Sequence, residues 1–235
     1  MLPLVKEHQH NDVPIIIGVN SEEGIYSTAR YINDNAKFAD INDKWDTKGP
    51  LLIFDSSNAS EAMMIVADSV REFYLEGSLA SMSTLHQVIN MFSDIVFWAG
   101  AHRFSQLAAQ HQLSPVYQYL LTYKATNTYA DLVLGLDSDS LGLGVCHADD
   151  LFHLFKNHKF QLQFTEKDLE IRENMLTWWT DFAKVRAPAG EIWQSKGPND
   201  PGYFEISETP HMGHGTDYQE RMQFWMQILD NFFND

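Results

Sequence analysis

Residues 13–24 read VPIIIGVNSEEG, and this stretch decides the fold. The apolar, largely β-branched run at 13–19 is typical of a strand buried on both faces of a parallel sheet. The polar, glycine-closed segment 20–24 then predicts a loop at the carboxyl end of that strand. Because open α/β sheets bind their ligands at this edge, the sequence predicts that Glu22 and Glu23 lie where ligands bind.

Helical periodicity dominates residues 60–111. Two apolar stripes at helical spacing consist of Met63, Ala67, Val70 and Phe73 and of Phe97, Ala101, Phe104 and Ala108. Further along, Thr165 with Asp168 resembles a capping box that starts a helix, and Pro188 ends its pattern. Thr216 with Gln219 predicts the start of a final helix. Its apolar stripe consists of Met222, Trp225, Leu229 and Phe232.

Two further segments have the composition of strands. Residues 116–123 follow Pro115 and are rich in aromatic and aliphatic side chains, and residues 203–206 form a shorter candidate. A long loop is expected over 125–149, and loops of that length are usually functional or mobile. Strands separated by helices predict the α/β class, helix-rich, with a few strands of a central sheet. No linker is evident, so residues 1–235 are expected to form one domain or part of one.

Composition excludes several classes of protein. With 44% apolar residues, the 235-residue chain can fill a core, and the single cysteine, Cys146, excludes an internal disulfide. The formal charge of -16 and the absence of a basic stripe argue against nucleic acid as a partner. We expect neither a membrane anchor nor a secretion signal in the chain, and a secreted or a cytoplasmic parent protein fits equally.

Two segments contain residues suited to chemistry. Glu23, at the end of an apolar strand, can accept a hydrogen bond from a histidine and fix its tautomer, although an ordinary solvated loop acid is the alternative. Residues 142–150 read GLGVCHADD, and their small side chains would present His147 toward a cleft. Histidine suits general acid/base work because it titrates near neutrality. The alternative is a surface histidine beside two acids, Asp149 and Asp150, at a helix N-terminus.

Other chemistry in this loop finds weaker support. Residues 137–142 resemble the start of a calcium-binding loop, but Leu141 and Ala148 occupy two ligand positions. A Cys146–His147 dyad is disfavoured because adjacent side chains seldom meet. The remaining metal candidate lacks a recognised ligand motif and consists of His147, Asp150 and His153. We therefore expect no metal.

Taken together, residues 13–24 and the sequence GVCHADDL at 144–151 resemble the acid loop and the histidine loop of the type-B carboxylesterase and cholinesterase family of α/β-hydrolases. Supporting stretches follow the family's order, at 115–119, 179–184, 203–206 and 222–225. The resemblance spans the whole chain and implies the C-terminal part of an α/β-hydrolase fold. It also implies that Glu23 is the triad acid, that His147 is the triad base and that no cofactor is needed.

The nucleophile of such a triad is not found in the sequence. In α/β-hydrolases the serine precedes the acid, which precedes the histidine, and here Glu23 precedes His147. None of the 13 glycines has a serine two residues later, so the chain contains no Gly-x-Ser-x-Gly elbow, and it contains no His-Gly-Gly oxyanion segment. We therefore expect the serine to lie upstream, in a missing N-terminal portion of the same domain, and the chain alone to be inactive.

The resemblance implies a carboxylic ester hydrolase that acts on small-molecule esters. It also implies that Ile25, Tyr26 and Ser27 contribute to the substrate pocket, with ordinary packing as the alternative. Two other functions stay open, which are a non-catalytic adhesion or ligand-binding relative and an inactive truncated product. A homodimer through the final helix is a further hypothesis, although an apolar stripe more often packs on the domain's own core.

Overall fold

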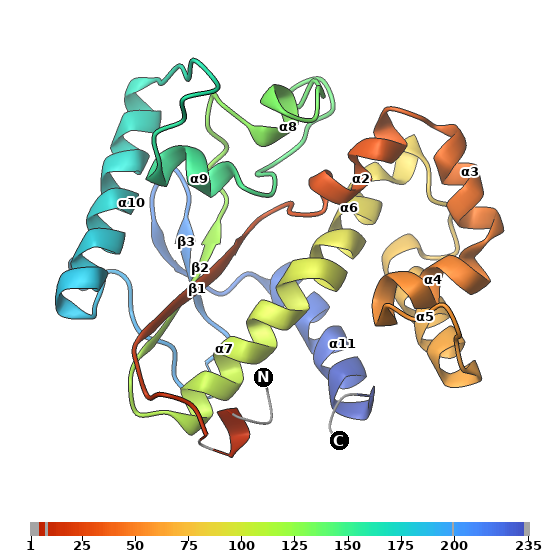
Figure 1. Ribbon diagram of the computed structural model, residues 1–235, viewed down its shortest axis with the longest axis horizontal. Coiled ribbons are helices and arrows are strands. Elements are labelled where there is room, and N and C mark those ends of the chain that lie inside the picture. Colours follow the sequence, from red (N-terminus) through yellow and green to blue (C-terminus); the bar gives the residue numbers. More distant parts are fainter. Residues whose placement is uncertain (1–4, 8, 199, 233–235) are drawn as a thin grey trace.

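The computed structural model describes residues 5–7, 9–198 and 200–232, which combine a small sheet with many helices (Figure 1). The strands are β1 (Ile15–Asn20), β2 (Val116–Leu121), β3 (Tyr203–Ile206) and β4 (His211–Gly213). The helices before β2 are α2 (Ile25–Ile32), α3 (Ala36–Asp43), α4 (Trp45–Phe54), α5 (Glu61–Leu75), η1 (Met82–Thr84), α6 (Leu85–Ser93), η2 (Asp94–Trp98) and α7 (Ala99–His111). The later helices are α8 (Tyr129–Leu132), α9 (Asp149–Leu154), α10 (Glu166–Val185) and α11 (Thr216–Phe232).

The sheet has the order β1-β2-β3-β4. β1, β2 and β3 run parallel, and β4 is antiparallel to β3. Asn20 pairs with Leu121, so β1 and β2 end at the same edge of the sheet. Gly18 is required in β1 because a Cβ there would lie 2.2 Å from the ring of Tyr119. This close approach fixes the register that carries residues 20–24 to the carboxyl edge.

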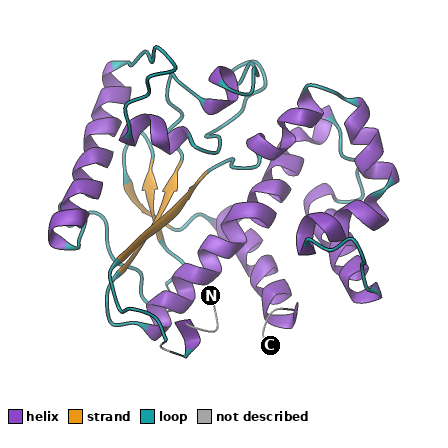
Figure 2. Cartoon of the chain, in the orientation of Figure 1, coloured by secondary structure: helices purple, strands orange, loops and turns teal. Residues whose placement is uncertain are grey.

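Helices cover both faces of the sheet (Figure 2). On one face, α10 packs on the sheet through a cluster of buried side chains that includes Trp178, Trp193 and Phe204. On the other face, α7 and α11 pack on the sheet, and Gln118 of β2 donates a hydrogen bond to the Tyr218 hydroxyl of α11 at 2.8 Å. The α/β class predicted from the sequence is therefore confirmed, whereas a single domain over residues 1–235 stays a prediction.

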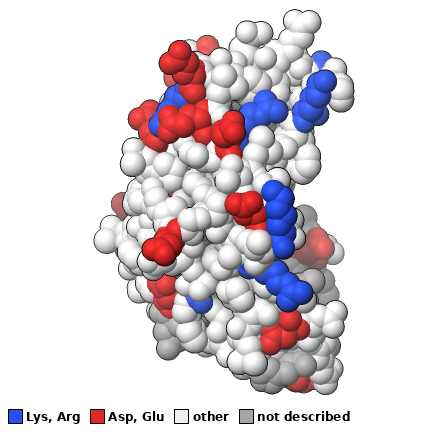
Figure 3. All heavy atoms as spheres, turned by 90° about the vertical axis from the view of Figure 1, so that its left-hand side faces the viewer, with Lys and Arg blue, Asp and Glu red and all other residues white. Residues whose placement is uncertain are grey.

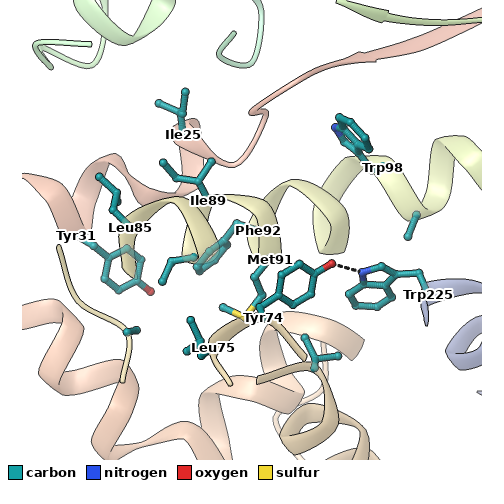
Figure 4. Close-up of a cluster of buried hydrophobic side chains, with 14 of the residues drawn as sticks. Ile25, Tyr31, Tyr74, Leu75, Leu85, Ile89, Met91, Phe92, Trp98 and Trp225 are labelled. Carbon is teal, nitrogen blue, oxygen red and sulfur yellow. Dashed lines mark hydrogen bonds between the residues drawn. The ribbon is translucent and has the colours of Figure 1, made fainter. Parts of the chain in front are cut away.

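Beside the sheet, helices α2 to α6 form a helical layer (Figures 1 and 4). The core cluster of this layer continues to the sheet at Val19 and to α11 at Trp225. In Figure 4, Ile25 lies against Leu85 and Ile89, close to Phe92. The sequence patterns did not predict the helices over residues 25–54. Each is only 8 to 10 residues long, and α4 contains Pro50, so no extended apolar stripe forms there.

Most other predicted elements agree with the structure to within a few residues. The strands predicted at 13–19 and 116–123 are observed at Ile15–Asn20 and Val116–Leu121, and the 203–206 strand is observed as predicted. The Thr165–Asp168 capping box is formed, and α10 ends at Val185. Besides the helices over residues 25–54, the structure adds β4, the short α8 inside the long loop, the 3-10 turn η1 and the π-helical turn η2.

The stripe of the final helix packs on the molecule's own core. Met222 and Trp225 of α11 are almost fully buried, which is the alternative weighed against dimerisation. The homodimer stays a prediction. On the face that carries α10, acidic and basic side chains are interspersed (Figure 3). None of the described helices is long and apolar enough to cross a membrane.

Candidate active site

The loop after β1 holds Glu23 in a fixed and buried position. The Glu23 side chain is only 6% exposed, and its Oε1 accepts a hydrogen bond from the Asn20 amide at 2.8 Å. Gly24 then starts the turn into α2, where its amide donates to the Ser93 hydroxyl at 2.8 Å. A Cβ at Gly24 would lie 2.1 Å from the carbonyl oxygen of Ile89. The acid loop is thus pressed against α6, and only glycine fits at the contact.

The loop that carries His147 is closed by an acid of the following helix. Asp149, the first residue of α9, accepts a hydrogen bond from the Cys146 amide at 2.7 Å and another from the Tyr129 amide. Ala148, between the histidine and this acid, has a left-handed backbone with φ of 70°. A non-glycine residue in that region is uncommon and costs free energy, so the surrounding contacts must hold this turn.

Several hydrogen bonds join the acid loop to the histidine loop, although the two are far apart in the sequence. The Glu22 carboxylate accepts from the Gly144 amide at 2.8 Å, and the Glu22 amide donates to the Val145 carbonyl at 2.9 Å. The Val145 amide donates to the Ser21 hydroxyl at 3.2 Å. The Asn20 side chain donates to the Cys146 carbonyl at 2.7 Å. The two loops therefore form one unit at the edge of the sheet.

Glu23 and His147 meet within this unit. The distance from His147 Nδ1 to Glu23 Oε2 is 2.7 Å, and because a carboxylate only accepts, Nδ1 is the donor. The imidazole side chain is 40% exposed, and no hydrogen bond to its Nε2 is found among the described residues. This arrangement leaves Nε2 as the proton acceptor of a partly exposed ring, whose tautomer is fixed by the Glu23 carboxylate.

Aromatic rings surround the imidazole. The Phe97 ring stacks on it with centroids 4.7 Å apart and an interplanar angle of 30°. The Tyr26 ring contacts it at 5.5 Å and is itself half exposed. The site is therefore polar on the side of the acid and apolar around the ring.

The hydrogen bond to Glu23 raises the pKa of His147 above its ordinary value, and this effect outweighs the partial burial that would lower it. The negative charges of Glu23, Asp150 and Asp149 act in the same direction. A pair of this kind stabilises the imidazolium that forms when a histidine takes up a proton.

Glu23→Gln is expected to lower the pKa of His147, because an amide cannot offer the charged acceptor that favours the imidazolium. Since the folded-state pKa is raised, this pair contributes its full stability below about pH 6.5, the ordinary value. The contribution is lost as the pH rises through the folded-state pKa. NMR titration of the His147 Cε1 proton in both chains measures the change. An identical pKa in the two chains would refute a working Glu23–His147 pair.

The three residues predicted to line the substrate pocket differ in how exposed they are. Tyr26 projects to the surface beside His147, Ser27 is partly buried, and Ile25 is fully buried in the core of the helical layer. Their role in substrate binding stays a prediction. Burial of Ile25 fits the packing alternative for that residue.

The residues weighed for other chemistry also have clear positions. Cys146 is fully buried, and burial raises the pKa of its thiol. His153 is likewise buried and points to the Tyr123 ring, with centroids 6.2 Å apart. Over residues 5–7, 9–198 and 200–232, no group of three histidine, cysteine or acidic side chains is arranged to hold a metal ion.

Several residues that shape the site were not singled out from the sequence. Asn20 stood inside the quoted loop, but nothing in its type showed that it would bind both loops. Ser93 is a polar residue in a helix, and its partner, the Gly24 amide, is distant in the sequence. Asp149 was expected only as a charge at a helix N-terminus, and its bond from the Tyr129 amide was not expected. Phe97 was assigned only to an apolar stripe, since periodicity does not distinguish a ring that packs in the core from one that packs on a histidine.

Comparisons with known proteins agree with the resemblance to carboxylesterases. The model of the carboxylesterase family matches residues 2–225. The chain is 30% identical over 235 residues to venom carboxylesterase-6 of Apis mellifera, covering 98% of this chain and 40% of that protein. It is 26% identical over 177 residues to juvenile hormone esterase of Tribolium castaneum, covering 73% of this chain and 30% of that protein. The chain thus spans less than half the length of the curated relatives it matches.

A solved structure supports the fold. The crystal structure of juvenile hormone esterase from Manduca sexta, with OTFP covalently attached, superposes with a TM-score of 0.79 at 17% sequence identity. The match covers 97% of this chain and 43% of that one. The fold is therefore that of the C-terminal part of an α/β-hydrolase.

Proposed function

Because the chain belongs to the carboxylesterase family, we propose that Glu23 and His147 are the acid and the base of a Ser–Glu–His triad that hydrolyses carboxylic esters. The observation that carries this proposal is the 2.7 Å hydrogen bond between His147 Nδ1 and Glu23 Oε2, which leaves Nε2 free of other partners in the part of the chain that the structure describes. Its substrates would be small-molecule carboxylic esters.

In the proposed reaction, His147 Nε2 takes the proton of a serine hydroxyl as that oxygen attacks the ester carbonyl. Glu23 stabilises the imidazolium, which then returns the proton to the leaving alcohol. Water attacks the acyl-enzyme in the second half of the cycle, with His147 again as the base. The serine and the donors for the oxyanion would come from sequence outside residues 1–235, in the same domain.

The edge of the sheet supports this division of parts. Within the described residues, β1 pairs with β2 and has no strand on its other side. Val13, just before the strand, is 51% exposed, although such an apolar, β-branched run normally lies buried in a parallel sheet. A strand from the remainder of the domain would pair with the open side of β1. Its loops would then lie at the carboxyl ends of the strands, where His147 lies.

The test compares two proteins with one aryl ester and one fluorophosphonate probe, which labels activated serines. The chain of residues 1–235 should give no label and no hydrolysis of p-nitrophenyl acetate above a His147→Gln control. An in-frame extension with a Gly-x-Ser-x-Gly elbow should give both. Hydrolysis by residues 1–235 at the rate of a full-length relative would refute the missing-serine proposal, and an unlabelled extension would refute the esterase proposal.

A further inference from the structure

We infer that the π-helical turn η2 is a positioning element for the proposed triad, and that Phe97 is the positioning residue that restrains the imidazole of His147. The catalytic consequence of this inference rests on the proposed function, whereas the restraint itself is a property of the chain alone. The motif of the histidine loop, at residues 144–151, does not include η2, which spans Asp94–Trp98.

The first observation is the stack of Phe97 on His147. One hydrogen bond from Nδ1 to Glu23 fixes the direction of that nitrogen, but it does not fix the tilt of the ring, because the χ2 torsion of histidine is broad. The near-parallel Phe97 ring, at 4.7 Å and 30°, restricts that tilt. The hydrogen bond and the stack together therefore define where Nε2 points.

The second observation is that the neighbouring residue of the same turn holds the acid loop. Trp98 is 3% exposed, and its indole Nε1 donates to the Asn20 carbonyl at 2.9 Å. The amide of Asn20 in turn donates to Glu23 at 2.8 Å. Of two consecutive residues of η2, Phe97 thus contacts the histidine itself, and Trp98 contacts Asn20, whose amide binds the acid.

The third observation is that η2 is not a regular helix. A π turn widens the helix to i→i+5 hydrogen bonds. Such turns are rare overall, but those that occur are often found at functional sites. Here the turn joins α6, whose Ser93 contacts the acid loop, to α7, which packs on the sheet. The extra residue lets one continuous helical segment make both sets of contacts.

The η2 turn is also bound to α11 by a buried ion pair. Asp94, its first residue, is fully buried and binds the guanidinium of Arg221 in α11 through both carboxylate oxygens. The same guanidinium lies over the Trp98 ring at 4.7 Å. Figure 4 shows Trp98 and the nearby pair of Tyr74 and Trp225, which is joined by a hydrogen bond of 2.8 Å. Because these contacts fix η2, the Phe97 ring of η2 can restrain the imidazole of His147.

The test is NMR on the chain itself with His147 labelled in the ring. Phe97→Leu should increase the picosecond–nanosecond mobility of the His147 ring, read from Cε1 relaxation. It should also lower the pKa of His147 by about 0.5, since a stacked aromatic ring favours the imidazolium by roughly 0.5–1 kcal/mol. Phe97→Tyr, which keeps the ring, should restore both values. If Phe97→Leu does not fold, Phe97→Met carries the same expectation.

A matched control separates restraint from general packing. Phe73 is another partly buried phenylalanine in a stacked pair, with Phe224 at 4.1 Å, and it lies on α5, which does not carry the site. Phe73→Leu should leave the mobility and the pKa of His147 unchanged. The inference is overturned by an unchanged His147 in Phe97→Leu, or by equal changes in both leucine variants. A Phe97-dependent His147 together with an extension that fails to bind the fluorophosphonate probe would instead reject the proposed function alone.

Discussion

Asp94→Asn is expected to lower the free energy of unfolding of the chain by about 3–5 kcal/mol, because it breaks a buried ion pair. The guanidinium of Arg221 would keep only Asp217, which is 82% exposed, as a counter-charge. Asp94 is 0% exposed, and Arg221 is 7% exposed. Besides the two bonds from Arg221, the Asp94 carboxylate accepts one from the Tyr74 hydroxyl. No water can replace these partners, so the loss should be near the upper end for a single substitution.

Urea denaturation measures this effect, and a second ion pair made by α11, with α7 instead of η2, provides the control. Arg103 of α7 binds Asp230 of α11 at 2.5 Å, but the Asp230 side chain is 49% exposed. Asp230→Asn should therefore cost less than about 1 kcal/mol. Similar losses in both variants would show that burial does not distinguish the two pairs, and the anchoring of η2 by Asp94 would have to be abandoned.

Glu23→Gln is expected to lower kcat about 10⁴-fold in an enzyme that contains this chain together with the proposed serine segment. The amide can keep the geometry, but it loses the negative charge that stabilises the imidazolium and can favour the wrong tautomer of His147. The KM for a small ester should change little, because Glu23 is buried behind the histidine.

The adjacent acid is the control for this loss. Glu22 is also in the acid loop, but its carboxylate accepts from the Gly144 amide and does not contact His147. Glu22→Gln should thus reduce kcat by less than about tenfold, through slight loosening of the two loops. Steady-state kinetics measure kcat for both variants. Equal losses of kcat would mean that Glu23 only supports the loop.

The sequence predicted β1, β2 and β3, but not β4, because the signals of these three strands are local. A β-branched run such as 13–19 and a capping box such as Thr165–Asp168 each contain their own physical cause. The pairing of Glu23 with His147 had no such local signal, since the two residues are 124 positions apart. It was inferred from the resemblance to a family, and the geometry then placed the two side chains in contact.

The helix before β2 shows why periodicity alone was insufficient. The predicted stripe put Phe97, Ala101 and Phe104 on one inward face, yet all three are only partly buried. The residues that α7 buries include the polar His102 and Ser105, which bind the hydroxyl of Tyr218 and the side chain of Gln118. A π turn leaves no periodic pattern in the sequence, and buried polar contacts are invisible to a search for apolar stripes.

The link from Arg221 through Trp98 to the acid loop has a consequence for biosynthesis. The ribosome makes residues 20–24 about 200 residues before Arg221, which at roughly 5–20 residues per second is a delay of about 10–40 s. Until α11 emerges and docks, Asp94 lacks the Arg221 guanidinium, and the Trp98 ring lacks the cation that lies over it. In the nascent chain η2 therefore lacks its support from α11, and the proposed pair gains that support only after α11 has been translated.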